Sequence, residues 1–306
     1  RVVSRDLYLR VVQAVFASLY LIIISGSLVR LTGSGLGCAD WPACSEGKFI
    51  DVSSTHAAIE HLNRLFTGVV ALSVVIAVLL SFGIRPKRRD LVVLSGGLVF
   101  GVLAQVVVGG VVVLTGLNPF SNIAHFLVSI MLMTNAFVLL KRAKLDGQQS
   151  DLLMRDRTSV VKTRSRQAVL AIVVLAGLAI ITGTVVTGTG PHAGDENAVR
   201  IGFAITSVVR VHSMSVLLCL ATAVGLFFHG RRDPTTWRVL AVPLERFLTV
   251  GFLQGLVGYV QYFSGIPVPL VAVHVAVSVA VWLSALDMYW HVLHSRLPDS
   301  TLTVLD

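Results

Sequence analysis

The chain has 306 residues, of which 55% are hydrophobic and 13% are charged, and its net charge is +9. Soluble domains carry about 25% charged residues, so the composition excludes an ordinary soluble globular protein. The positive charge does not indicate a nucleic-acid partner, because the basic residues gather in the connections between hydrophobic runs, as membrane topology requires.

Eight hydrophobic runs are long enough to cross a bilayer as helices, which takes about 20 residues each. None shows the alternating pattern of a barrel strand. The seventh run has Pro243, Glu245 and Arg246 at its start, which makes it the least regular. We therefore predict an all-α polytopic membrane protein with transmembrane helices at 10–30, 62–84, 91–115, 122–141, 168–188, 204–228, 239–263 and 268–292.

The basic residues also predict the orientation of these helices. Twenty of the 25 lysines and arginines lie on one side, namely before the first run, after the eighth, in the connections that follow the second, fourth and sixth runs, or at the ends of runs that border these segments. The positive-inside rule places that side in the cytoplasm. We expect a multi-pass protein of the cell membrane with both termini in the cytoplasm.

A single offset of 149 residues relates polar residues and glycines in the two halves of the chain. We interpret the halves as two copies of one four-helix module, at 1–145 and 167–306, joined by a charged cytoplasmic linker at 146–166. The matched pairs are Gln105 with Gln254, Gly116 with Gly265, His125 with His274, and Asn63 with His212.

The first run ends in a segment rich in glycine, at 25–38, and a similar segment at 182–190 follows the fifth run. Small residues allow a backbone or a flat ligand to approach closely. The loop after the first segment contains Cys38 and Cys44. In an oxidising compartment this pair is either a structural disulfide or a redox-active thiol pair, and the sequence leaves both readings open.

Glu60 and Asn63 lie at the expected start of the second helix. Residues three apart share a helix face, so these two side chains point together, whereas His61 points elsewhere. Glu60 is a candidate catalytic acid or base. The alternative is a structural carboxylate that interacts with the helix dipole.

Three histidines are expected at a similar depth near the outer face: His125, His212 and His274. A single histidine near a helix end is most often an interfacial residue. Two histidines that face each other across a bundle can instead hold the iron of a porphyrin. We predict that His212 and His274 form such a pair, whereas His125 faces Asn63, whose amide is a weak ligand and leaves the iron open to chemistry.

Three arginines lie near the same face, namely Arg30, Arg64 and Arg210. Haem propionates are carboxylates, for which arginine is a natural partner. The alternative is that these side chains extend to the lipid headgroups.

The sequence resembles the haem A synthase family, and the resemblance spans all eight runs. It is carried by the stretch from Thr32 to Cys38 with Trp41, Pro42 and Cys44, by 60–64, and by 122–125. The stretch 187–195 is similar to the actinobacterial type. The resemblance implies two pseudo-symmetric four-helix bundles, with haem b in the C-terminal bundle and the substrate haem O in the N-terminal bundle.

The reaction that the resemblance implies oxidises a ring methyl of haem O to a formyl group, through an alcohol, which yields haem A for a terminal oxidase. Glu60 matches the family's essential glutamate, and Cys38 and Cys44 match its outer cysteine pair. His125, His212 and His274 match three of its four haem-ligand histidines. Asn63 stands at the fourth position, which is a departure from the family pattern, and His56 and His61 are weak substitutes for it.

A second hypothesis is a non-enzymatic di-haem electron-transfer protein of the membrane, which would hold two similar haems and modify neither. Expected partners of the enzyme are haem O, the haem O synthase that supplies it, membrane lipid, and a second copy of the chain. The sequence does not identify an electron acceptor.

Overall fold

The structure is a computed structural model that describes residues 2–45, 47–147 and 159–295. Within these residues it contains eight long helices, each long and apolar enough to cross a membrane, so the prediction of an all-α polytopic membrane protein is confirmed. The helices are α1 (Arg5–Leu31), α2 (Thr55–Ser81), α3 (Arg89–Leu114), α4 (Pro119–Lys144), α6 (Thr163–Thr189), α7 (Ile205–Gly230), α8 (Pro234–Phe263) and α9 (Val268–Leu293).

The chain divides into two compact units with four helices each. Unit 1 comprises Arg1–Lys144 and Thr187–Phe203, and unit 2 comprises Leu145–Val186 and Ala204–Asp306. Residues 148–158 of the predicted linker lie outside the described residues. The assignment of a different chemical role to each half stays a prediction.

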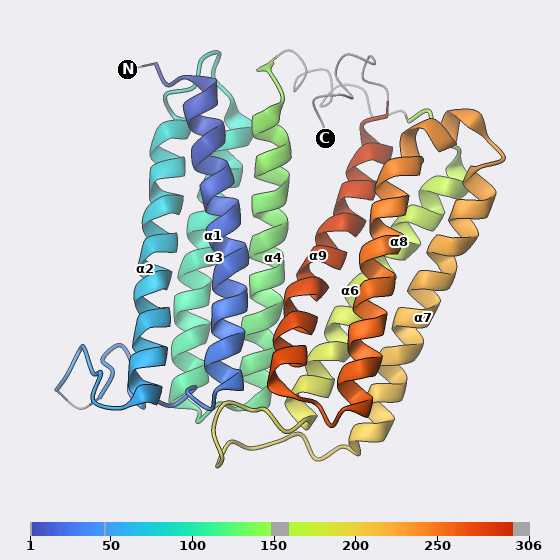
Figure 1. Cartoon of the computed structure of the whole chain (residues 1–306). Helices are drawn as coiled ribbons and strands as arrows, with labels where there is room; N and C mark the ends of the chain where they lie inside the picture. Colours follow the sequence, from blue (N-terminus) through green and yellow to red (C-terminus); the bar gives the residue numbers. More distant parts are fainter. Residues whose placement is uncertain (1, 46, 148–158, 296–306) are drawn as a thin grey trace. The chain divides into compact units, whose positions relative to one another are not determined.

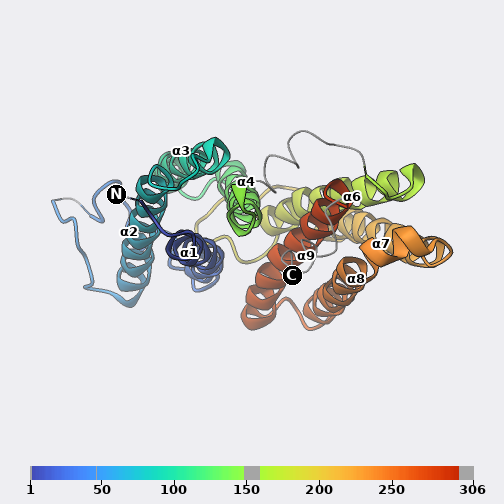
Figure 2. The ribbon, with the colours of Figure 1, turned by 90° about the horizontal axis from the view of Figure 1, so that it is seen from above.

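In unit 1 the helices close into a four-helix bundle, because α1 packs on α2 and α4, and α3 packs on the same two helices (Figure 2). In unit 2, α8 packs on α7 and α9, and α6 joins them through a shared core that includes Ile172, Leu240 and Met288. Consecutive helices run in opposite directions in each unit (Figure 1). We call the end where α1 leads to α2, and where α6 leads to α7, the loop end of the respective unit.

Six of the eight helices begin before their hydrophobic runs, and the difference is largest for α2. The α2 helix begins at Thr55 rather than 62, because the Ser54 hydroxyl accepts a hydrogen bond from the Ala57 N–H at 3.1 Å and caps the helix. Glu60 and Asn63 therefore lie in the second and third turns and not at the start of the helix, which corrects the sequence-based placement.

The α8 helix begins at Pro234, five residues before the predicted start. Proline suits the first turn of a helix, where its missing N–H is no loss. The Thr236 hydroxyl donates to the Asp233 carboxylate at 2.5 Å just before this turn. Pro243 and Glu245 consequently lie inside α8, and the helix continues through this proline.

The repeat predicted from the 149-residue offset has a structural counterpart in each unit. The Gln105 side-chain amide donates to the His125 carbonyl at 3.3 Å, and Gln254 donates to the His274 carbonyl at 3.0 Å. Each glutamine thus joins the third helix of its unit to the fourth. The matched polar residues serve the same packing purpose in both halves.

The turns that precede α4 and α9 are also equivalent. Gly116 and Gly265 adopt positive φ angles of +60° and +79°, in the left-handed region that glycine enters without steric cost. Leu117 and Ile266, the residues that follow, have φ angles of 60°. One turn conformation therefore sets where both histidine-bearing helices begin.

The segment Thr187–Phe203 belongs to unit 1, although it connects two helices of unit 2. The Gly35 N–H donates to the Gly194 carbonyl at 2.9 Å. Ala193 and Ala198 share a buried cluster with Leu117 of the α3–α4 turn. The loop end of unit 1 is therefore covered by residues from the second half of the sequence.

Candidate functional site

Two histidine rings face each other in unit 2. His212 on α7 and His274 on α9 have ring centroids 6.4 Å apart, with an angle of 72° between the rings. A metal bound to imidazole nitrogens at about 2.0–2.1 Å on each side holds two such centroids about 6 Å apart. The spacing of the two rings fits two axial ligands on opposite sides of one haem iron.

The surroundings of the two rings also fit a haem. The His274 Nδ1 atom is buried and has no hydrogen-bond partner within the described ranges. The Thr182 hydroxyl lies 3.2 Å from the His212 Nδ1 atom. A Cβ atom added at Gly183 or Gly258 would lie 3.1 Å from the His212 ring or 3.0 Å from the His274 ring, so glycine leaves space for each imidazole.

Unit 1 contains the equivalent arrangement with one histidine replaced. Asn63 on α2 accepts a hydrogen bond on Oδ1 from the Ser25 hydroxyl of α1 at 2.7 Å. This contact corresponds to the contact between Thr182 and His212 in unit 2. His125 on α4 has a buried Nδ1 atom to which no described residue forms a hydrogen bond, and its ring lies against Gly109, as the ring of His274 lies against Gly258.

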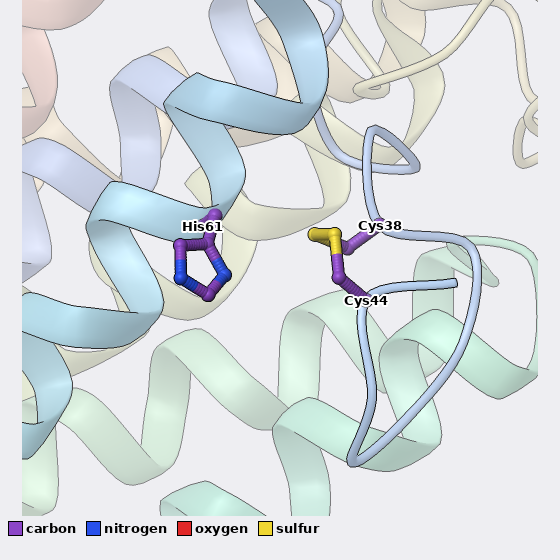
Figure 3. A group of neighbouring side chains, drawn as sticks. All are labelled: Cys38, Cys44 and His61. Carbon is purple, nitrogen blue, oxygen red and sulfur yellow. A yellow bond between two sulfur atoms is a disulfide. The ribbon is translucent and has the colours of Figure 1, made fainter. Parts of the chain in front are cut away.

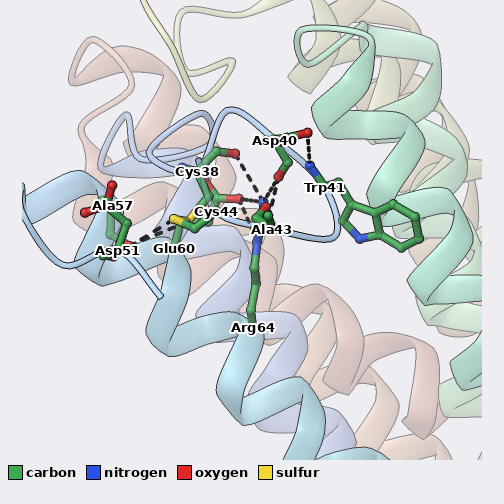
Figure 4. Close-up of polar contacts among 9 residues, drawn as sticks. All are labelled: Cys38, Asp40, Trp41, Ala43, Cys44, Asp51, Ala57, Glu60 and Arg64. Atoms are coloured by element: carbon green, nitrogen blue, oxygen red, sulfur yellow. Dashed lines mark hydrogen bonds and ion pairs between the residues drawn. A yellow bond between two sulfur atoms is a disulfide. The ribbon is translucent and has the colours of Figure 1, made fainter. Parts of the chain in front are cut away.

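Glu60 is fixed from two directions (Figure 4). Its Oε1 atom accepts hydrogen bonds from Arg64 Nη2 at 2.6 Å and Nε at 3.1 Å. Its Oε2 atom accepts the Cys38 N–H at 2.7 Å. The Glu60 side chain is 7% exposed and that of Arg64 is 23% exposed, so this ion pair is largely withdrawn from water.

Arg64 also organises the loop that carries the cysteines. Its guanidinium group donates to the carbonyl oxygens of Cys38, Asp40 and Ala43 at 2.9–3.1 Å. These contacts, together with Glu60, account for the guanidinium group. The predicted role of Arg64 at a propionate stays a prediction.

Cys38 and Cys44 form a disulfide, and both residues are buried. Asp51 stabilises the same loop by accepting hydrogen bonds from the Ser53 N–H and the Ser45 hydroxyl, each at 3.0 Å. Hydrogen bonds from Ser53, and then from Ser45, lower the Asp51 pKa from 3.8 to about 2.

His61 lies beside this disulfide (Figure 3). Its side chain is buried, and neither ring nitrogen has a hydrogen-bond partner among the residues described. A ligand atom of His61 and the two sulfur atoms lie within 4.8 Å of one another. Because the sulfur atoms are bonded to each other, they do not provide two thiolate ligands for a metal. His56 contacts the Ser34 hydroxyl at 2.9 Å.

The other predicted arginines differ in their surroundings. Arg30, near the end of α1, donates from Nη1 to the His192 carbonyl of the covering segment. Arg210 on α7 is exposed. Sequence reasoning did not single out Ser25, Thr182 or Arg200. The alignment of the two glycine-rich segments contained the signal for Ser25 and Thr182, because each residue precedes a matched glycine.

The chain is similar to known proteins over most of its length. A family model described as cytochrome oxidase assembly protein, COX15-CtaA, matches residues 10–50 and 47–286. A protein of Listeria monocytogenes named heme A synthase is 24% identical over 297 residues, which cover 92% of this chain and 94% of that protein. A Lysinibacillus sphaericus protein of the same name is 24% identical over 85% of this chain and 87% of its own length. The expected actinobacterial type stays a prediction.

Proposed function

Since the chain belongs to the COX15-CtaA family of cytochrome oxidase assembly proteins, we propose that it is a haem A synthase, an oxidoreductase that converts the ring methyl of haem O to a formyl group. The names of its relatives support this activity. The observation that carries the proposal is the difference between two equivalent positions. Unit 2 has His212 opposite His274, whereas unit 1 has Asn63 in the place of His212.

In unit 2, His212 and His274 would hold haem b through their imidazole rings. Thr182 orients the His212 ring through its Nδ1 atom, and Gln254 anchors the backbone of His274. A haem held by two imidazoles would suit electron transfer or a structural role and not the modification of a substrate.

In unit 1, His125 would bind the iron of haem O on one side. Asn63 would place only a weakly ligating amide near the haem, and Ser25 holds that amide in place. Haem, when bound, supplies the redox chemistry of the oxidation. The protein provides a fixed ring position and one face of the iron without a strong ligand.

Glu60 would act as the acid or base beside the reacting ring edge. It lies three residues before Asn63, so the two side chains share one face of α2. The Cys38 N–H and Arg64 hold both carboxylate oxygens in a defined orientation. This arrangement keeps a proton acceptor in place, with Arg64 balancing its charge.

We further propose that the loop ends of both units face the outside of the cell membrane and that both termini are cytoplasmic. The distribution of lysine and arginine supports this orientation. A disulfide in the loop after α1 is also typical of an oxidising compartment. The haem sites would then lie toward the outer face.

The test is the substitution Glu60→Gln, which keeps a hydrogen-bond acceptor for the Cys38 N–H but removes the carboxylate. Membranes that contain the variant and are supplied with haem O should lose haem A while unit 2 keeps its haem b. The matched control is Glu245→Gln, because Glu245 is an exposed glutamate of α8. Unchanged haem A in the Glu60→Gln membranes would overturn the assignment of Glu60.

The number and type of bound haems separate this proposal from the di-haem electron-transfer protein. Pyridine-haemochrome spectra of the purified protein, recorded before and after incubation with haem O under oxidising conditions, should show one constant haem b and conversion of the second haem. Two permanent haems with identical spectra and no conversion would favour the electron-transfer protein.

A further inference from the structure

Two arginines come together at the loop end of unit 1, and neither has a carboxylate partner among the described residues. Arg30 is near the end of α1, and Arg200 is in the segment Thr187–Phe203. Arg30 donates to the His192 carbonyl, and Arg200 Nη2 donates to the adjacent Pro191 carbonyl at 2.6 Å. The hydrogen bonds to two neighbouring carbonyl oxygens thus hold both guanidinium groups in the same region. The two positive charges repel each other there.

The hydrogen bonds to carbonyls do not neutralise these charges. Neither Arg30 nor Arg200 forms an ion pair among the described residues, whereas Arg64 pairs with Glu60 and Arg88 with Asp90. Arg200 Nη1 is buried and has no hydrogen-bond partner in the part of the chain that the structure describes. Two adjacent cations with an unused buried donor provide what an anion with several oxygen atoms requires.

Arg30 also lies on the face of α1 that leads to the proposed substrate site. Gly26 in unit 1 corresponds to Gly183 in unit 2, and Gly183 lies against the ring of His212. Arg30 follows Gly26 by four residues, so it lies on the same helix face about 6 Å nearer the loop end. A flat ligand held at His125 and Asn63 would reach Arg30 with the edge that points to the loop end.

We propose that Arg30 and Arg200 form a dicarboxylate site that binds the two propionate groups of the substrate haem in unit 1. This proposal rests on the proposed function and specifies how the substrate is oriented. Arg200 provides the second cation from the other half of the sequence. The site selects a porphyrin that has two free carboxylates on one edge, and it directs the opposite edge into the bundle.

The experiment compares two ligands that differ only at the propionates, namely iron protoporphyrin IX and its dimethyl ester. Each is titrated into the purified full-length protein with the unit 2 site already filled, and binding is followed by the Soret difference spectrum. The variant His125→Ala shows which part of the signal comes from unit 1. The readout is the ratio of the two Kd values, because a variant that folds less well weakens both ligands alike.

For the unchanged protein, the free acid should bind about tenfold to a hundredfold more tightly than the ester, as expected for charge-assisted hydrogen bonds. The substitution Arg200→Gln should bring the ratio close to one, and Arg200→Lys should restore part of it. The control Lys48→Gln removes an exposed lysine from the loop after α1 and should leave the ratio unchanged. An equal ratio in the unchanged protein and in Arg200→Gln overturns the proposal.

Phospholipid headgroups are the other source of an anion. The titrations are therefore repeated in nanodiscs of phosphatidylcholine alone and with phosphatidylglycerol. A ratio that does not respond to Arg200→Gln, together with loss of phosphatidylglycerol binding in that variant, would assign the site to lipid and overturn the proposal. Haem A formation by the same preparation tests the proposed function separately. If haem A forms but the ratio of the two Kd values does not change in Arg200→Gln, the propionate site is wrong and the proposed function stands.

Discussion

Replacement of Arg64 by methionine should release the loop that contains Cys38 and Cys44. Methionine keeps much of the arginine's apolar length but provides no donors, so the carbonyls of Cys38, Asp40 and Ala43 lose their partners. Glu60, which is 7% exposed, retains only the Cys38 N–H. Breaking one side of a buried ion pair costs about 3–5 kcal/mol, and the partial exposure of Arg64 favours the lower end of this range.

Hydrogen exchange of the loop amides measures this cost locally, without requiring the whole protein to unfold. A loss of about 3 kcal/mol should accelerate exchange at the Cys38 amide by about a hundredfold, because each 1.4 kcal/mol corresponds to a factor of ten. The double variant Glu60→Gln, Arg64→Met leaves no stranded charge and should exchange about tenfold more slowly than Arg64→Met. If the double variant exchanges as fast as the single variant, or if Arg64→Met leaves the loop protected, the ion pair does not hold the loop.

Three further changes test other parts of the structure. Asn63→His should convert the unit 1 site into a second bis-histidine site with His125. The spectrum of a haem bound there should then change to a six-coordinate low-spin form. An unchanged spectrum would contradict the equivalence of the two units. Gly37→Ala should loosen the loop after α1, because its Cβ would lie 2.3 Å from a backbone oxygen, and equal thermal stability of the variant and the unchanged protein would contradict this. Because hydrogen bonds lower the Asp51 pKa to about 2, its stabilising effect should be complete above about pH 4 and disappear as the pH falls through 2; Asp51→Asn should remove this acid dependence from hydrogen exchange of the loop.

The sequence was sufficient to predict the helices and the repeat. Length and hydropathy determine that a segment crosses a bilayer, and the regular offset between Gln105 and Gln254 has a matching hydrogen bond in each unit. The start of α2 was misplaced because hydropathy marks where a segment becomes apolar, whereas the Ser54 cap marks where the backbone becomes helical.

The contacts around Glu60 were harder to predict. Helical geometry does not reveal that the loop returns to place the Cys38 N–H on Glu60 and the Cys38–Cys44 sulfur atoms beside His61. Such contacts depend on the tertiary path of an irregular segment, for which hydrophobic periodicity carries no signal. The same reason applies to Arg200, because nothing in the sequence around it indicates that it joins Arg30.

The segment Thr187–Phe203 connects two helices of unit 2 but belongs to unit 1. This placement affects how the two halves of the chain can be separated. A cut in the connection between α4 and α6 would divide the helices evenly. The N-terminal fragment would nevertheless lack Thr187–Phe203, the segment that covers its loop end. The two halves follow one plan, but this covering segment makes unit 1 depend on residues from the second half of the sequence. Co-expression of the two half-proteins should therefore restore the covered loop end of unit 1, which the N-terminal fragment lacks when it is expressed alone.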